Sequence, residues 1–160
     1  MKIRIREWYR DDLPQIQILW LEYCRKVARS DMRLTADAEI AMKGWLSERF
    51  RQPRSIGLVA HDADDDATVL GFAIGRVDDW ESVPPIIESR RIGIVDAVYV
   101  VDEHRRKRIG AQLIDHIVEK MRSKNAVAVE TIYDAWNDAA AAAWHRAGFA
   151  PWMVHAYRML

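Results

Sequence analysis

The seven residues from Arg105 to Ala111 read RRKRIGA, and the interpretation of the whole chain depends on them. An apolar run typical of a strand, Gly93–Val101, precedes them, and an amphipathic helix pattern follows them. Basic side chains and a glycine therefore lie between the end of a predicted strand and the start of a predicted helix. The first amide groups of a helix lack partners within the helix and carry partial positive charge, so this position suits an anion such as a pyrophosphate.

The residues on either side of this stretch predict the fold. In chain order, the patterns predict a strand near residues 3–8, helices over 13–29 and 37–50, strands over 56–61, 68–77 and 93–101, a helix over 109–121, a strand over 126–133, a helix over 137–148 and a closing hairpin over 149–160. This order is typical of an α/β fold. We expect a single domain over residues 1–160, with a mixed, largely antiparallel sheet flanked by about four helices and a central βαβ unit over 93–133. In such sheets ligands bind near the carboxyl ends of the parallel strands, where the basic stretch lies.

Two of the predicted helices carry specific signals. The helix after the basic stretch has one apolar stripe, formed by Ile109, Leu113, Ile114, Ile117, Val118 and Met121. In the last helix, Asn137 suits the N-cap position, and Gly148 suits the position just beyond the C-terminal end. The helix after the basic stretch is therefore expected to pack on a sheet through this stripe.

Composition and charge exclude several classes of protein. Lys plus Arg and Asp plus Glu both number 24, and this neutral balance argues against bulk binding of nucleic acid or of a membrane surface. The one cysteine, Cys24, excludes an intrachain disulfide and a zinc site built from cysteines. The five histidines show no metal-ligand spacing, so no metal site is predicted. No apolar run approaches the length that spans a membrane, and we expect a cytoplasmic protein.

Two motifs in this sequence resemble the GCN5-related N-acetyltransferase (GNAT) superfamily. The family's pyrophosphate loop is usually written Gln/Arg-x-x-Gly-x-Gly/Ala, and here Arg105 fills the first place and Gly110 the last. Arg108 stands where the first glycine is expected, so we expect its backbone to avoid any conformation that only glycine adopts. The second motif has an Asn, an Ala three residues on, an aromatic residue seven on and Gly-Phe eleven on, which here are Asn137, Ala140, Trp144, Gly148 and Phe149.

The resemblance implies a GNAT-like fold and transfer of an acetyl group from acetyl-CoA to an amine. It implies that the backbones of Val98 and Val100 bind the pantetheine arm and polarise the thioester carbonyl, that Asn137 reaches the same arm and that Trp144 lies near the sulfur. The residues implied for the pyrophosphate are Arg105, Arg106, Lys107, Arg108, Ile109, Gly110 and Ala111. The acceptor is expected to be a small-molecule amine or a peptide N-terminus, and a homodimer is one expected assembly.

Acylation of an amine needs a group that takes a proton from the amine, often through water. Side chains alternate along a strand, so we expect Asp96 to share the face of Val98 and Val100. Asp96 and Glu130 are both carboxylates in otherwise apolar strands, and each is a candidate base, although each is also compatible with a purely structural hydrogen bond.

The departing thiolate needs a proton as well. Many GNAT members carry Tyr where this chain has Trp144, whose indole N–H is a donor but not a usable acid. Tyr133 and Tyr157 are weak candidates for the acid, and sheet packing is the favoured interpretation of both. A missing acid also leaves a second hypothesis open, namely a non-catalytic module that binds or senses acyl-CoA.

The sequence makes two further predictions about the reaction. Transfer is expected to be a direct attack without an acetyl-enzyme intermediate, because Cys24 lies on the apolar stripe of the first helix and no Ser-His-Asp order is present. Residues 78–91 are expected to be irregular, and the acceptor is expected to enter between this loop and the first two helices. The loop's acids Asp78, Asp79 and Glu81 favour an acceptor that is cationic before it loses its proton.

Overall fold

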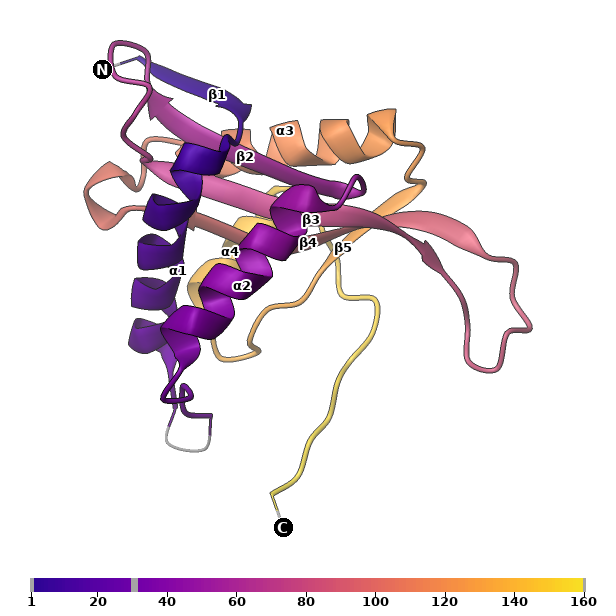
Figure 1. Ribbon diagram of the computed structural model, residues 1–160. Helices are drawn as coiled ribbons and strands as arrows, with labels where there is room; N and C mark the ends of the chain where they lie inside the picture. Colours follow the sequence, from indigo (N-terminus) through magenta and orange to yellow (C-terminus); the bar gives the residue numbers. More distant parts are fainter. Residues whose placement is uncertain (1, 30–31, 160) are drawn as a thin grey trace.

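A computed structural model of the chain describes residues 2–29 and 32–159 (Figure 1). The elements are β1 (Ile3–Glu7), α1 (Leu13–Val27), α2 (Ala38–Arg51), β2 (Ser55–Asp62), β3 (Gly71–Trp80), β4 (Arg90–Val100), α3 (Ile109–Ser123), β5 (Ala128–Thr131) and α4 (Asp138–Arg146), with short 3-10 turns over Arg10–Asp12 and Asp102–His104. The strands form one sheet in the order β1-β2-β3-β4-β5. Neighbouring strands are antiparallel except for β4 and β5, which are parallel and joined by α3. The predicted mixed α/β fold with a βαβ unit is confirmed.

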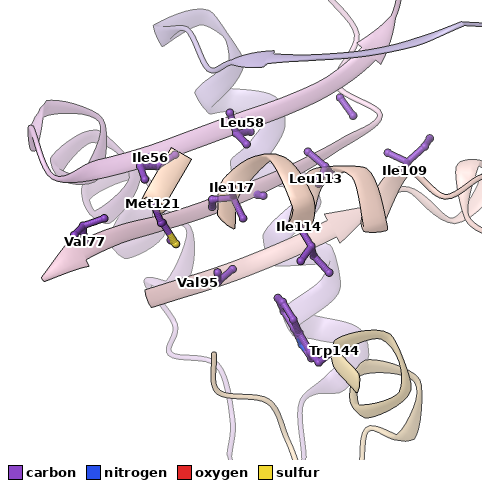
Figure 2. Close-up of a cluster of buried hydrophobic side chains, with 12 residues drawn as sticks. Ile56, Leu58, Val77, Val95, Ile109, Leu113, Ile114, Ile117, Met121 and Trp144 are labelled. Carbon is purple, nitrogen blue, oxygen red and sulfur yellow. The ribbon is translucent and has the colours of Figure 1, made fainter. Parts of the chain in front are cut away.

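One face of the sheet is covered by α3 and α4, and we call it the α3 face (Figure 2). The residues that α3 buries there are Ile109, Leu113, Ile114, Ile117 and Met121, and Val118 is partly buried beside them. They pack on small and branched side chains of β2, β3 and β4, such as Leu58 and Val95. The apolar stripe expected for this helix is therefore confirmed.

The other face is covered by α1 and α2, and we call it the α1/α2 face (Figure 1). Its core joins Ile16 of α1 and Leu46 of α2 to Phe72 and Ile74 of β3 and Tyr99 of β4. Aromatic rings are prominent there, and those of Phe72 and Tyr99 lie 5.9 Å apart. This face is therefore built by residues from both halves of the chain.

The register between β3 and β4 shifts at one point. Ile74 is paired with Ala97, but the next residue of β3, Gly75, is paired with Val95, so Asp96 is an extra residue in β4. Such a β-bulge bends the strand and interrupts the alternation of side chains.

The bulge turns Asp96 away from the face that the sequence predicted. Val98 and Val100 pack against the core of the α3 face, as does Val95. Asp96 instead forms an ion pair with Arg49 of α2, on the α1/α2 face. The prediction that Asp96 shares the face of Val98 and Val100 is wrong, because strict alternation holds only in a strand without an extra residue.

Two further expectations are corrected. The irregular stretch is shorter than 78–91, because β3 continues to Trp80, which is paired with Arg90 at the start of β4. No closing hairpin follows α4, since residues 150–159 contain no strand, and Leu160 lies outside the described residues. This segment runs away from the sheet in Figure 1, and the Trp152 ring lies 5.8 Å from that of Trp80. The alternating side chains of this segment suggested a hairpin, but an isolated hairpin is only marginally stable unless a further strand or a helix packs against it.

Candidate functional site

Beyond its pairing with β5, strand β4 presents an open edge. The two strands are paired only from Ile92 to Val95 on β4, so the second half of β4 has a neighbour on its β3 side alone. The amide of Val101 donates to the carbonyl of Leu70 on that β3 side, at 3.0 Å. Because backbone groups of successive residues in a strand point to opposite edges, those of Val98 and Val100 point to the open edge.

The loop that follows β4 has two non-glycine residues in the left-handed region. The φ angles are 60° for Arg106 and 63° for Arg108, which is the N-cap of α3. The left-handed region favours glycine but is open to other residues, so Arg108 does not adopt a conformation that only glycine can take. The left-handed conformation costs an L-residue roughly 1–2 kcal/mol, and it turns successive amide groups toward a common side, as in anion-binding loops.

The amide groups of this loop are available to a ligand. Within the described part of the chain, the structure records no acceptor for the N–H groups of residues 106–111. A Cβ added at Gly110 would meet only the Cγ2 of Val100, at 3.7 Å, which is an ordinary contact. Packing of the protein therefore gives no reason for a glycine at position 110, whereas close approach of an anion does. The loop thus fits a pyrophosphate.

The basic side chains of the loop are exposed and differ in their partners. Arg105 folds back, with Nη2 2.7 Å from Asp102 Oδ1 and Nε donating to the carbonyl of Val100 at 3.1 Å. Lys107 lies 3.3 Å from His104 Nδ1. For the side chains of Arg106 and Arg108 the structure records no partner among the residues that it describes, so they are the cations most available to a phosphate.

The second motif supplies both ends of α4. At the N-terminal end, Asn137 Oδ1 accepts a hydrogen bond from the amide of Ala140, at 3.0 Å. At the C-terminal end, Gly148 has φ 87°, and the amide of Phe149 donates to the carbonyl of Trp144 at 3.0 Å. The predicted N-cap and C-terminal glycine are confirmed, and together they fix the length and direction of α4.

Trp144 itself is part of the hydrophobic core. Its side chain is 8% exposed, points toward Ile114 and Val95 (Figure 2) and packs on Phe149 with ring centroids 5.0 Å apart. The place near the sulfur that the resemblance implies for Trp144 stays a prediction. What the structure adds is a packing role, which a large aromatic residue at this position fulfils.

Asp96 is held between two guanidinium groups. Its Oδ1 accepts a hydrogen bond from Arg76 of β3, and Nη2 of Arg49 lies 3.8 Å from Oδ2. Arg76 also pairs with Asp78, with Nε 2.6 Å from Oδ2. The Oδ2 atom of Asp96 is buried, and no donor among the described residues bonds to it. It is therefore a buried acceptor whose hydrogen-bonding capacity no described donor uses.

Glu130 lies on the same face of the sheet. It is paired with Ile94 of β4, and its neighbour Val129 packs against the core of the α3 face, so the side chain of Glu130 points to the α1/α2 face. It is half-buried, and the structure records neither a hydrogen bond nor an ion pair for its carboxylate within residues 2–29 and 32–159. Of the two predicted bases, Glu130 is the one whose carboxylate has no partner among the residues that the structure describes.

The acids predicted to attract the acceptor, at the end of β3 and in the loop after it, are less available than the sequence suggested. Asp79 pairs with Arg54 at 3.0 Å and with Arg91 at 3.3 Å, and these arginines hold the pKa of the Asp79 carboxyl below its usual range. Asp78 pairs with Arg76. Their attraction for a cationic acceptor stays a prediction, but two of the three predicted acids already have basic partners.

One residue of this region was not singled out by the sequence analysis. Tyr23 of α1 receives a hydrogen bond from Asn137 Nδ2 at 3.4 Å, and its ring lies 5.9 Å from that of Tyr99 on β4. The only sequence signal was a hydroxyl group within an otherwise apolar helical stripe.

In the described residues, no helix is long and apolar enough to cross a membrane, and no cluster of His, Cys, Asp and Glu could hold a metal ion.

Comparisons with known proteins give a consistent result. Residues 3–149 match the model of the acetyltransferase (GNAT) family. The L-methionine sulfoximine/L-methionine sulfone acetyltransferase of Pseudomonas aeruginosa is 32% identical over 107 residues, which are 67% of this chain and 57% of that protein. The same enzyme of Pseudomonas paraeruginosa matches equally, so the chain spans little more than half the length of these curated relatives.

Solved structures show the same fold at low identity. An aminoglycoside N-acetyltransferase in complex with CoA has a TM-score of 0.76 at 16% identity, over 99% of this chain and 95% of that one. An aminoglycoside 6′-N-acetyltransferase from Acinetobacter haemolyticus has a TM-score of 0.75 at 15% identity, over 98% and 97%. A transcriptional regulator from Bacillus halodurans has a TM-score of 0.75 at 15% identity, over 99% and 100%. Likeness at these identities concerns the fold alone.

Proposed function

The chain belongs to the acetyltransferase (GNAT) family, and from this premise we propose that it transfers an acetyl group from acetyl-CoA to a primary amine by direct attack of the amine on the thioester. The observation that carries the proposal is the loop after β4. Its amide groups at residues 106–111 have no acceptor within the described residues, and they stand at the N-terminus of α3.

In this proposal the pyrophosphate of acetyl-CoA binds to the loop amides, with Arg106 and Arg108 as charged partners. The pantetheine arm lies along the open edge of β4, where the backbone groups of Val98 and Val100 are directed. The arm competes there with Arg105 for the carbonyl of Val100. Backbone donors at this edge polarise the thioester carbonyl, which is the usual way to stabilise the negative charge that develops on its oxygen.

The two carboxylates on the α1/α2 face have different roles in the proposal. Glu130, which has no protein partner among the described residues, accepts the proton of the amine, directly or through a water molecule. Asp96 orients the amine through Oδ2, which is buried in the free protein and becomes reachable when the side chain rotates. Cys24 takes no part in the reaction, because burial raises the pKa of its thiol and so disfavours the nucleophilic thiolate.

The acceptor class follows from the chemistry around Asp96. The buried Oδ2 suits an ammonium or amine group, and Arg49, with Nη2 3.8 Å away, suits a carboxylate on the same small molecule. An α-amino acid combines these two groups, and the curated relatives are described as acting on methionine sulfoximine and methionine sulfone. Other small amines and peptide N-termini are alternatives within the same reaction.

A second candidate function is a module that binds acyl-CoA without turning it over. The observation that favours it is the burial of Trp144, at a position where many GNAT members carry a tyrosine. Such a module would bind acetyl-CoA through the same loop, so binding alone does not separate the two functions. Release of free CoA does.

The experiment is a screen for CoA release from acetyl-CoA with a panel of amines. The panel contains L-methionine sulfone, L-methionine sulfoximine, an aminoglycoside and a peptide with a free N-terminus. We expect amine-dependent release, with the amino acids preferred. Binding of acetyl-CoA by calorimetry without release in the presence of any amine would support the non-catalytic module instead.

A further inference from the structure

We propose that the hydroxyl group of Tyr23 is the acid that protonates the departing thiolate of CoA. This inference rests on the proposed function and adds a residue that neither motif contains. The reaction needs such a group because the position expected to supply it holds Trp144, whose indole is in the core of the α3 face.

The position of Tyr23 carries the first part of the argument. Tyr23 belongs to α1, which covers one face of the sheet, whereas Asn137 begins α4 on the other face. Their side chains meet, with 3.4 Å between Nδ2 and Oη, because β5 has ended at Thr131 and leaves the edge of β4 open. The hydroxyl therefore lies beside the edge of β4 that β5 leaves unpaired, where the thioester is proposed to bind.

The second part of the argument is the contact between Tyr23 and β4. The ring of Tyr23 lies 5.9 Å from that of Tyr99, the residue between Val98 and Val100. The proposed thioester binds to the backbone groups of these two valines. Tyr23 is thus adjacent to the strand that would hold the reacting carbon and sulfur atoms.

The third part of the argument is the hydrogen bonding of the Tyr23 hydroxyl. Tyr23 Oη accepts a hydrogen bond from Asn137, so its own proton is left for another acceptor. Within the described residues the structure records no such acceptor. A half-buried hydroxyl with an unused proton is suited to donate that proton to a ligand atom.

The charges around Tyr23 keep the phenol protonated. Burial raises the pKa of Tyr23 above its usual value, and Asp134 raises it as well, whereas the hydrogen bond from Asn137 lowers it. Cys24 on the same helix raises it slightly, and Arg105 from the loop lowers it. The neutral, proton-donating form is therefore the one present at neutral pH.

The proposed step balances as follows. The amine lone pair forms the C–N bond, the C–S bond breaks, and its electron pair stays on the sulfur. The sulfur takes the proton from Tyr23 Oη, and Glu130 takes a proton from the amine nitrogen. Glu130 then releases this proton to the solvent, and the phenolate takes one proton back from the solvent, so both side chains return to their starting states. The products are the N-acetyl amine and free CoA.

The test compares Tyr23→Phe with Tyr9→Phe. Both changes remove one phenolic oxygen, and Tyr9 is an exposed residue outside the proposed site. We expect Tyr23→Phe to lower kcat by about 10²–10⁴-fold with an unchanged Kd for acetyl-CoA, and Tyr9→Phe to retain wild-type kcat. A fluorinated tyrosine at position 23, whose phenol is more acidic, should retain kcat at neutral pH and shift the alkaline limb of the pH–rate profile to lower pH.

Each outcome has a definite meaning. If the wild-type protein turns over and Tyr23→Phe keeps kcat within twofold, the Tyr23 assignment is overturned and the proposed function stands. An unshifted alkaline limb in the fluorotyrosine protein overturns the assignment as well, even if Tyr23→Phe is too unstable to assay. If the wild-type protein binds acetyl-CoA but releases no CoA with any amine, both proposals are overturned.

Discussion

The two faces of the sheet differ in what they bury. The α3 face is an apolar core in which the side chains of α3 meet those of β2, β3 and β4. The α1/α2 face buries an apolar and aromatic core too, but it also holds Asp96 between Arg49 and Arg76 and directs Glu130 toward the acceptor side. In the proposed function the two faces have different tasks: the first supports the loop that binds the cofactor, and the second supplies the groups that act on the amine.

The largest effect is expected at Glu130, on the α1/α2 face. Glu130→Gln should lower kcat by about 10²–10⁴-fold near neutral pH, because a neutral amide cannot accept the amine proton. The loss should shrink at high pH, where more of the amine is already deprotonated. A pH–rate profile with one good amine measures this, and the Kd for acetyl-CoA serves as the control. Wild-type rates across the profile would show that Glu130 is not the base.

The next effect concerns stability on the α3 face. Leu113 is fully buried, so Leu113→Ala should lower the free energy of unfolding by about 2–5 kcal/mol. Val118 lies on the same helix but is only partly buried, and Val118→Ala should cost clearly less. Urea denaturation of both variants tests the comparison. Equal losses would mean that α3 does not pack through the single stripe described above.

A smaller loss of stability is expected at the charged cluster of the α1/α2 face. Asp96→Asn leaves Arg76 and Arg49 without their shared carboxylate, and we expect a loss of about 1–3 kcal/mol in the free energy of unfolding. The matched control is Asp79→Asn, which removes an exposed carboxylate that also pairs with arginines. Exposed pairs contribute little, so the control should lose less. A larger loss in the control than in Asp96→Asn would contradict the burial argument.

The smallest effect should separate binding from folding at Gly110. An alanine there fits the protein, since its Cβ would lie 3.7 Å from Val100 Cγ2, and stability should be kept or slightly increased. The added methyl group lies where the pyrophosphate approaches, and we expect about tenfold weaker acetyl-CoA binding by calorimetry, with Gly110→Trp weaker still. Unchanged affinity in both variants would mean that the cofactor does not approach this part of the loop.

Local patterns in the sequence were enough for the α3 face and for α4. The stripe from Ile109 to Met121 predicted which side of α3 is buried. Asn137 and Gly148 predicted both ends of α4. These features depend on residues within a few positions of one another, where helix geometry and capping chemistry decide the outcome.

Tertiary structure decided the α1/α2 face and the surroundings of the unpaired edge of β4. One extra residue in β4 placed Asp96 on the face opposite to the predicted one, because the register against β3 is a property of two strands together. The left-handed backbone of Arg108 is likewise uncommon for its residue type, and the sequence did not predict it. Tyr23 and Asn137 are 114 residues apart in sequence, and no local pattern predicts that they meet.

The sequence by itself therefore determined the family, the order of elements as far as α4 and the candidate loop for the cofactor, since each depends on short-range spacing. Only the tertiary structure decided which side chains lie beside the unpaired edge of β4. The physical reason is that packing brings Tyr23, Asn137 and Tyr99 together from α1, the start of α4 and β4. Such contacts depend on the fit of whole elements rather than on the preferences of single residues.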